Sequence, residues 1–231
     1  MVTTSRNLVS INKSFFRGLV PTAQLKYPLY VIAYGMSMAE SKILYLDSPG
    51  KQNTDSVVEA VTERLQKGDI KQVVVASDTG ETAMKVINRM NGMDVRIVVV
   101  TSHCGFDKEG ECAMSPQMEA QIRNAGATLV RASHVLSGVE RSLSKKLGGS
   151  SRAEAIAEAL RGLFGQGMKV AVEITIMAAD SGAIQCGEGV EVVAIAGTEY
   201  GADTAIVVRP AHANGFFNFR VREIVAIPRR K

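Results

Sequence analysis

The chain has 231 residues, enough to bury a sizeable core in one domain, and its 46% hydrophobic and 22% charged residues are typical of a globular protein. Its net charge of +4 comes from residues 1–39, which hold four basic residues and no acidic one, so the rest is neutral and no basic face for nucleic acid is expected. No apolar run approaches the ~20 residues of a membrane span, so a membrane is not expected as a partner either.

The first 39 residues differ from the rest of the chain. They are basic, contain Ser and Thr, and lack a convincing amphipathic period, a composition that suits an organelle-targeting segment. The alternative is that translation starts at Met36 or Met38, because a natural first strand and turn follow at once. We therefore predict residues 1–39 as a leader that is targeting, disordered or a misassigned start, and residues 40–231 as a single α/β domain.

Strands and helices alternate through the first half of this domain. A short strand is predicted at 43–46, and an amphipathic helix with a repeating apolar face at 54–66. An apolar strand begins at Val73, helical spacing resumes at Ala83, and a second apolar strand follows at 95–100. Continuous apolar strands separated by helices are typical of a parallel sheet with helices on both faces.

The second half contains clear helix starts and a group of late strands. Ser115 before Pro116 predicts a capped helix, and Ser151 with Glu154 predicts a capping box, with a short basic helix at 139–147 between them. Further strands are predicted at 128–131, 168–177, 190–196, 204–208 and 223–227. Because few helices separate the late strands, we expect antiparallel members at the edge of the sheet.

The cysteines are odd in number and scattered. Cys104, Cys112 and Cys186 favour free thiols in a reducing compartment over a disulfide framework, which predicts a cytoplasmic protein. Cys104 stands beside His103, but adjacent residues rarely share a metal and no second pair has suitable spacing. No metal site is therefore expected.

The stretch from Ser77 to Gly80 is the strongest candidate site. It follows a buried strand and precedes a helix, whose N-terminus leaves backbone N–H groups without partners and carries a partial positive charge. Hydroxyl residues and a glycine there suit a phosphate, with Thr82 as a further contact. Helix capping also explains these residues, and Asp78 and Glu81 must point away from any bound anion.

Polar residues follow two further strands. Thr101, Ser102, His103 and Gly105 end the strand after the Ser77 turn, and ligands of open parallel sheets bind at such strand ends. Loop solubility explains these residues equally well. Ser137 and Arg141 begin the basic helix, where Arg141 suits bidentate pairing with a phosphate, although a solvated basic face accounts for it as well.

Glu173 and Thr175 interrupt the apolar strand predicted at 168–177. A charge inside such a strand is costly unless it is hydrogen-bonded, which favours a functional role at the ligand edge of the sheet. The turn from Asp180 to Gly182 ends this strand and is expected at the same edge.

Four stretches resemble a known family: VVVASDTGETAMKV, SHVLSGVERSLSKKLGG, EAIAEALRGLFGQGMKVAVEITIMAADSGAI and the RPAH of residues 209–212. Together they look like the archaeal-type stand-alone proteins similar to the C-terminal α/β domain of pyruvate kinase, over about residues 41–231. The resemblance implies a three-layer α/β/α sandwich with a mixed, mostly parallel sheet. It also implies that the turn at residues 77–80 corresponds to the loop with which regulated pyruvate kinases grip a sugar-phosphate effector, and that flavin mononucleotide (FMN) binds in this region.

The resemblance does not imply kinase activity. Pyruvate kinase chemistry belongs to a separate (β/α)8 barrel of about 250 residues, for which the chain has no room. The expected function is binding of a phosphorylated small molecule, most of all FMN, at the C-terminal edge of the sheet. The alternative is a regulatory or sensor domain that binds a sugar-phosphate or nucleotide effector without catalysis. No acid–base dyad or nucleophile triad in the sequence decides between an enzyme and a sensor.

The residues expected to bind the cofactor all lie in or after predicted strands. They are Ser77, Asp78, Thr79, Gly80, Thr82, Thr101, His103, Gly105, Ser137, Glu173, Thr175, Asp180 and Gly182. No catalytic residue is assigned, the partner is a small phosphorylated ligand, and homo-oligomerisation is left open.

Overall fold

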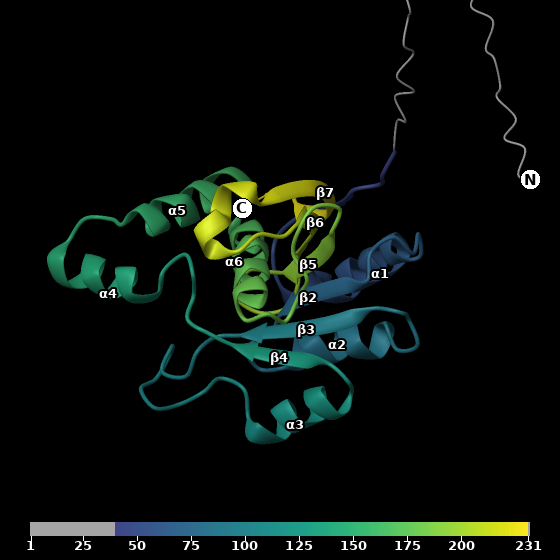
Figure 1. Cartoon of the computed structure of the whole chain (residues 1–231), viewed down its shortest axis with the longest axis horizontal. Helices are drawn as coiled ribbons and strands as arrows, with labels where there is room; N and C mark the ends of the chain where they lie inside the picture. The colour runs from purple at the N-terminus through teal and green to yellow at the C-terminus, as the bar shows by residue number, and fades with distance from the viewer. Residues whose placement is uncertain (1–39, 231) are drawn as a thin grey trace, which may run out of the picture. The chain divides into compact units, whose positions relative to one another are not determined.

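The computed structural model describes residues 40–230, and the leader predicted at residues 1–39 lies outside them. A seven-stranded sheet organises this part of the chain, in the order β1-β7-β6-β5-β2-β3-β4 (Figure 1). The strands are β1 (Leu44–Leu46), β2 (Gln72–Ala76), β3 (Arg96–Thr101), β4 (Thr128–Arg131), β5 (Val192–Ala196), β6 (Thr204–Arg209) and β7 (Arg220–Pro228).

Helices cover both faces of the sheet. They are η2 (Lys51–Asn53), α1 (Thr54–Leu65), α2 (Glu81–Arg89), α3 (Pro116–Asn124), α4 (Gly138–Leu147), α5 (Arg152–Phe164), α6 (Gln166–Asp180) and η3 (Ala213–Asn218). Helices α1, α2 and α3 pack with one face of the sheet, and α6 packs with the other. The expected three-layer α/β/α sandwich is confirmed.

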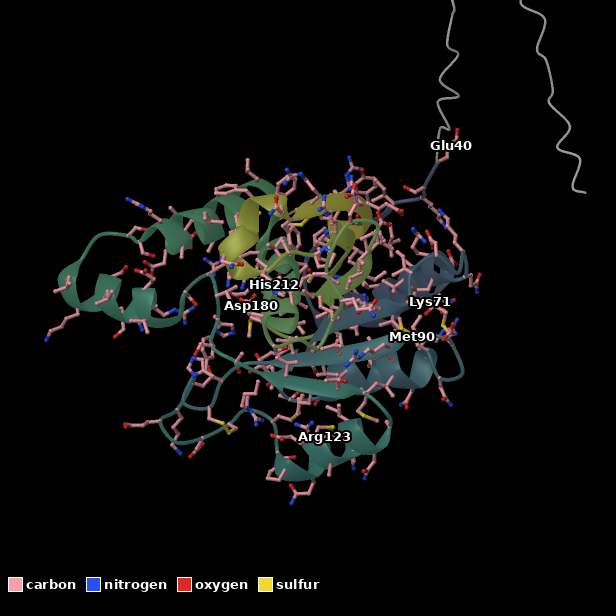
Figure 2. The ribbon with its side chains drawn as sticks, in the orientation of Figure 1. Glu40, Lys71, Met90, Arg123, Asp180 and His212 are labelled. Carbon is pink, nitrogen blue, oxygen red and sulfur yellow. A yellow bond between two sulfur atoms is a disulfide. The ribbon has the colours of Figure 1, made fainter. Side chains whose placement is uncertain are left out.

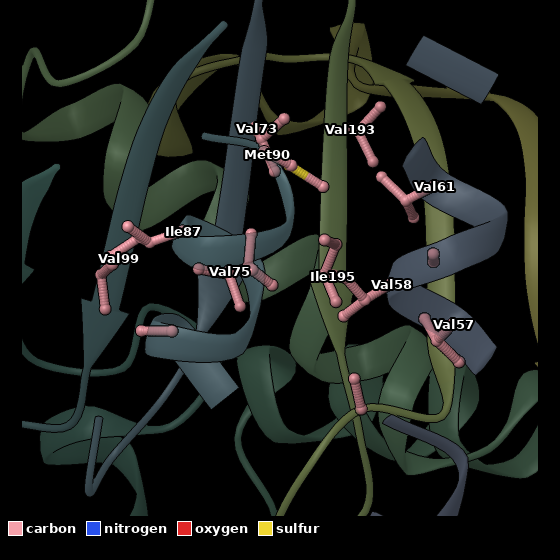
Figure 3. Packing of buried hydrophobic residues seen from close by; sticks show 14 of the residues in the cluster. Val57, Val58, Val61, Val73, Val75, Ile87, Met90, Val99, Val193 and Ile195 are labelled. Carbon is pink, nitrogen blue, oxygen red and sulfur yellow. The ribbon is translucent and has the colours of Figure 1, made fainter. Parts of the chain in front are cut away.

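The core divides into two clusters because strand residues alternate between the two faces. In β2, Val73 and Val75 belong to the cluster under α1 and α2, whereas Val74 belongs to the cluster under α6. All three side chains are fully buried. Figure 3 shows the first cluster, where Val61 of α1 and Met90 after α2 lie over the strands.

Local sequence signals place several helix starts correctly. The Ser115 hydroxyl accepts a hydrogen bond from Met118 N–H at 3.2 Å, and Pro116 occupies the first turn of α3. Ser151 and Glu154 form the predicted capping box of α5, each side chain accepting from the other's backbone N–H at 3.1 and 3.0 Å. The cap residues therefore fix these boundaries, as expected.

The strand predicted at 168–177 is wrong, because these residues form most of helix α6. Gly165, with φ of 94°, separates α6 from α5. A helix buried nearly all round loses the polar face that reveals a helical period. Val and Ile at its centre then mimic a strand by their propensity alone.

The sheet is mixed and mostly parallel, as expected. Strand β6 is antiparallel to both β5 and β7, whereas the other neighbouring pairs are parallel. The predicted antiparallel strand is confirmed, but β6 lies inside the sheet, so its expected place at the edge is wrong. The early strand β1 pairs with β7 through Leu44 and Ala226 and occupies that edge instead.

The prediction of free thiols is wrong for two of the three cysteines. Cys104 and Cys112 form a disulfide, and Cys186 remains a thiol. The loop between them folds back on itself, since Gly105 N–H donates to the Glu111 carbonyl at 2.7 Å.

Among residues 40–230, no helix combines the length and the apolar character that crossing a membrane requires.

Candidate functional site

A pocket of about 250 Å³ opens where β2, β3 and β5 end. These three strands are parallel, so their carboxyl ends lie at one edge of the sheet, the usual place for ligands in open α/β sheets. Residues after β2 and β3, the start of α6 and the loop from β5 to β6 line the pocket. The structure thus brings together four segments that are far apart in the sequence.

The turn after β2 supplies two of the predicted residues to this pocket. The Ser77 hydroxyl accepts a hydrogen bond from Ala83 N–H at 3.2 Å and so caps α2. Asp78 turns toward β3, where its Oδ1 accepts from Ser102 N–H at 2.8 Å. The Asp78 carboxylate therefore fastens the ends of two strands together.

Thr79, Gly80 and Thr82 do not line the pocket. Gly80 has φ of 96°, and a Cβ atom there would lie 2.1 Å from Cγ of Met118 in α3. The glycine is therefore required by its backbone conformation and by the close approach of α3, whether or not a ligand binds.

Ser102 carries an unsatisfied hydroxyl at the end of β3. The residue is only 3% exposed and lines the pocket beside Thr101, yet its Oγ has no hydrogen-bond partner among the described residues. Leaving a buried polar group unpaired costs about 1–3 kcal/mol. Such a group at the wall of a pocket is suited to a hydrogen bond with a ligand.

Helix α6 contributes a buried ion pair to the pocket wall. Lys169 and Glu173 are 3% and 2% exposed, and the Lys169 ammonium contacts the Glu173 carboxylate one turn later. Glu173 also accepts a hydrogen bond from Leu136 N–H at 3.0 Å. Burial lowers the pKa of Lys169 below its usual range, although Glu173 acts in the opposite direction.

Glu173 and Thr175 thus belong to a helix, and the interpretation of both as strand residues is wrong. Glu173 lines the pocket, as expected. Thr175 is fully buried, and its hydroxyl donates to the Ala171 carbonyl at 2.7 Å within the helix. Its side chain therefore has an internal partner and no exposure to a ligand.

Asp180 and Gly182 lie at the opposite edge of the sheet, so their expected place is wrong. Helix α6 runs antiparallel to β2 and β5, so its last residues lie near the amino ends of these two strands. There Asp180 Oδ1 accepts from Ala213 N–H at 3.1 Å and lies 3.2 Å from Nδ1 of His212 (Figure 2). Nearby, Gln185 N–H donates to the side chain of Gln72, the first residue of β2.

Three aromatic rings gather at the mouth of the pocket. The Phe106 and His134 ring centroids lie 4.7 Å apart, and His103 completes the cluster at 5.6 Å from Phe106. Burial lowers the pKa of His134, which favours the neutral ring. Of these three residues, only His103 is among the predicted site residues.

Arg141 of α4 extends over this cluster. Its guanidinium carbon lies 5.2 Å from the centre of the Phe106 ring, and one nitrogen lies 3.4 Å from the Ser137 hydroxyl. Within the described part of the chain, no carboxylate lies at ion-pair distance from Arg141. The predicted residues His103, Gly105 and Ser137 line an adjoining depression of about 240 Å³, which shares Arg141 with the pocket.

Sequence reasoning missed Lys169 and Arg161. Lys169 stands four residues before Glu173, the spacing of an ion pair on a helix, but this signal was hidden by the strand interpretation. Arg161 is held by Gln166 at 2.6 Å, and this contact across the α5–α6 boundary is not visible in the sequence. No group of three or more metal-ligating side chains occurs in residues 40–230.

A family model described as "Pyruvate kinase, alpha/beta domain" matches residues 55–208, about two thirds of the chain. The matched span runs from the start of α1 to β6 and includes every residue that lines the pocket.

Proposed function

Because this chain belongs to the family of the pyruvate kinase alpha/beta domain, we propose that its pocket binds a phosphorylated small molecule, with FMN as the leading ligand. The observation that carries the proposal is the combination, in one pocket, of an unpaired hydroxyl and a guanidinium without a counter-charge. Ser102 Oγ has no hydrogen-bond partner, and the Arg141 guanidinium has no carboxylate partner, among the described residues. The first suits a polar ligand atom and the second suits an anion.

The proposed phosphate position is at Arg141 rather than at the start of α2. A guanidinium presents two parallel N–H donors to a phosphate, and the cations of Arg161 and Lys169 line the same pocket. At the start of α2 the Ser77 hydroxyl already caps the helix, and Gly80 is packed against α3. The sequence predicted a different phosphate position, at Thr79 and Thr82, and the experiment below distinguishes the two positions.

The residues present fit the ring system of a flavin. Phe106, His134 and His103 offer flat apolar surface at the mouth, where aromatic rings pack offset or edge to face. Ser102 offers a hydroxyl that can donate to or accept from a polar ring edge. When bound, a flavin would supply hydride-transfer chemistry, while this chain's own residues hold the phosphate and shield the ring.

A regulatory role without catalysis is the second candidate. It is favoured by two of the pocket's three acidic groups, Asp78 and Glu173, because both have partners inside the protein. A carboxylate committed to structural hydrogen bonds is a poor general base. In this role the same pocket takes a sugar phosphate or a nucleotide effector.

The test is to measure the absorbance of the purified protein, identify any released ligand by mass, and titrate the ligand-free protein with FMN and riboflavin. The Arg141→Met variant is expected to weaken FMN binding about 10-fold to 100-fold, as loss of a charged hydrogen bond costs about 1.5–3 kcal/mol. Riboflavin has no phosphate, so its affinity should not change.

Thr79→Val is the matched variant for the competing site. If Thr79→Val weakens FMN binding and Arg141→Met does not, the phosphate lies at the start of α2. A protein that binds neither FMN nor riboflavin but binds a sugar bisphosphate supports the regulatory role. Failure of all three probes to bind would overturn the proposed function.

A further inference from the structure

The loop between β3 and α3 carries an exposed disulfide beside the pocket. Cys104 and Cys112 are both exposed, so their sulfurs are within reach of a reductant in solution. The residues between them form no helix or strand. Exposed disulfides are those that react in thiol–disulfide exchange, whereas buried structural ones resist it.

The disulfide closes the part of the loop that holds Phe106. Apart from it, the backbone hydrogen bonds and the ion pair of this segment are internal: Gly105 N–H donates to the Glu111 carbonyl, Glu111 N–H donates to the Lys108 carbonyl, and Lys108 pairs with Glu111. Such bonds shape the loop locally without closing it covalently. Apart from the ring contacts that His103 and Phe106 make with His134 and Arg141, the loop is anchored at its two ends, by buried Ser102 and buried Met114.

Phe106 connects this loop to the pocket. It lines the pocket, its ring packs against His134, and the Arg141 guanidinium lies on its face. A cation on an aromatic face contributes about 0.5–1 kcal/mol at exposed sites, which is too weak to hold an open loop by itself. The position of Phe106 over the pocket therefore depends on the closed loop.

We propose that Cys104–Cys112 is a thiol–disulfide exchange site that takes a dithiol reductant and thereby controls access to the pocket. A thiolate of the reductant attacks one cysteine sulfur, forms a mixed disulfide, and releases the other cysteine as a thiolate that takes up a proton. The second thiol of the reductant then displaces the remaining cysteine. The reductant leaves as its own disulfide, so two electrons and two protons end on the protein's cysteines.

The opening of the loop on reduction does not depend on which ligand the pocket binds. The expected change in ligand affinity, by contrast, rests on the proposed function. Reduction opens the loop, frees Phe106 from His134 and Arg141, and uncovers the pocket. Cys186 provides an internal reference, because burial raises the pKa of its thiol and lowers its reactivity.

The test compares the full-length protein before and after treatment with dithiothreitol under native conditions. Alkylation followed by mass analysis should show two additional labelled cysteines, Cys104 and Cys112, after reduction. Amide hydrogen exchange in residues 103–113 should become at least ten times faster, while exchange in β2 and β5 stays unchanged. FMN affinity should fall several-fold on reduction.

A Cys104→Ser, Cys112→Ser double variant should behave as the reduced protein and ignore dithiothreitol, whereas Cys186→Ser should behave as wild type. Resistance of the disulfide to native reduction, or equal loop exchange in both states, would overturn the proposal. If FMN binds neither state but the loop still opens on reduction, the proposed function fails while the exchange site stands.

Discussion

Single residues in the pocket wall contribute unequally to stability, and the Lys169–Glu173 pair is the clearest case. Both side chains are buried, so each charge depends on the other for compensation. Lys169→Met should lower the free energy of unfolding by about 3–5 kcal/mol, because it leaves the Glu173 carboxylate buried without a counter-charge. Urea denaturation measures this loss.

The control for this prediction is the double variant Lys169→Met, Glu173→Gln. A glutamine side-chain oxygen can still accept the hydrogen bond from Leu136 N–H, but it carries no charge. The double variant should therefore regain most of the lost stability. A single Lys169→Met variant within about 1 kcal/mol of wild type would contradict a role for charge compensation.

At the residue scale, the sequence predicts pocket residues best where polar side chains directly follow an apolar strand. Ser77, Asp78 and Thr101 end strands that are evident from their apolar runs, and all three line the pocket. Ser102 has the same signal, although the sequence does not show that its hydroxyl is left unpaired, whereas Arg161 has none, since its role depends on which distant segments approach it. Whether these residues hold a ligand stays a prediction.

Arg64 joins a helix to two strands, near the edge of the sheet where β2 begins. Its guanidinium, at the end of α1, forms paired hydrogen bonds of 2.8–2.9 Å with Asp69 before β2 and with Glu223 of β7. Hydrogen bonds from Arg64 hold the pKa of Glu223 and of Asp69 below their usual ranges. Carboxylates with lowered pKa stabilise the fold above their unfolded-state pKa and lose this contribution as pH falls.

Arg64→Met should therefore cost about 2 kcal/mol of unfolding free energy at pH 7, where both carboxylates are charged. The difference from wild type should shrink as pH falls below the ordinary range of carboxyl pKa values and through the lowered pKa of the two partners, because they then take up protons in the folded protein as well. Thermal unfolding at a series of pH values measures it. A difference that is constant with pH would show that packing of the side chain, rather than its charge, stabilises the fold.

Arg89→Met is the matched control. Arg89 also forms two hydrogen bonds of 2.8 Å with a glutamate, Glu59, but both side chains are about half exposed. Exposed pairs contribute about 0.2–1 kcal/mol, so this variant should change stability little at any pH.

At the element scale, predictions succeeded where a helix has a polar face and a cap, as α3 and α5 do. Helix α6 has neither: its N-cap is Gly165 with no side-chain cap, and its residues are buried nearly all round. Its misinterpretation as a strand also placed Asp180 at the wrong edge of the sheet. Because the apolar pattern of α6 was assigned to a strand, Asp180 was expected at the carboxyl-end edge of the sheet, whereas it lies near the opposite edge.

For the whole molecule, the two core clusters share one sheet and should unfold together. Val74 and Val75 are fully buried neighbours that face opposite clusters. Val74→Ala and Val75→Ala should each cost about 2–3 kcal/mol, from two lost methyl groups and the cavity left behind. Each should shift a single unfolding transition, measured by near- and far-ultraviolet circular dichroism together.

Val139→Ala is the control for both variants. Val139 is 75% exposed, so its truncation should change stability by less than about 0.5 kcal/mol. Two separate transitions in either core variant would show that the layers on the two faces unfold independently.

The overall architecture could be predicted because alternating strands and helices restrict the topology of the first half. The pairing of β1 with β7 and the disulfide between Cys104 and Cys112 could not, since both depend on chain segments folding back toward each other. The same holds for the pocket, whose walls come from residues 76–201.

The reversed direction of β6 has an evolutionary consequence. Because β5 and β6 are antiparallel, residues 197–203 return directly across the rim without a crossover helix, and Gly197, Glu199 and Tyr200 form part of the pocket wall. Ala202 and Asp203 in this connection are fully buried, and Ala202 N–H donates to the Thr54 hydroxyl at 3.0 Å, whereas Glu199 and Tyr200 are exposed. Substitutions at these two exposed positions can therefore reshape one wall of the pocket while the layers beneath stay intact.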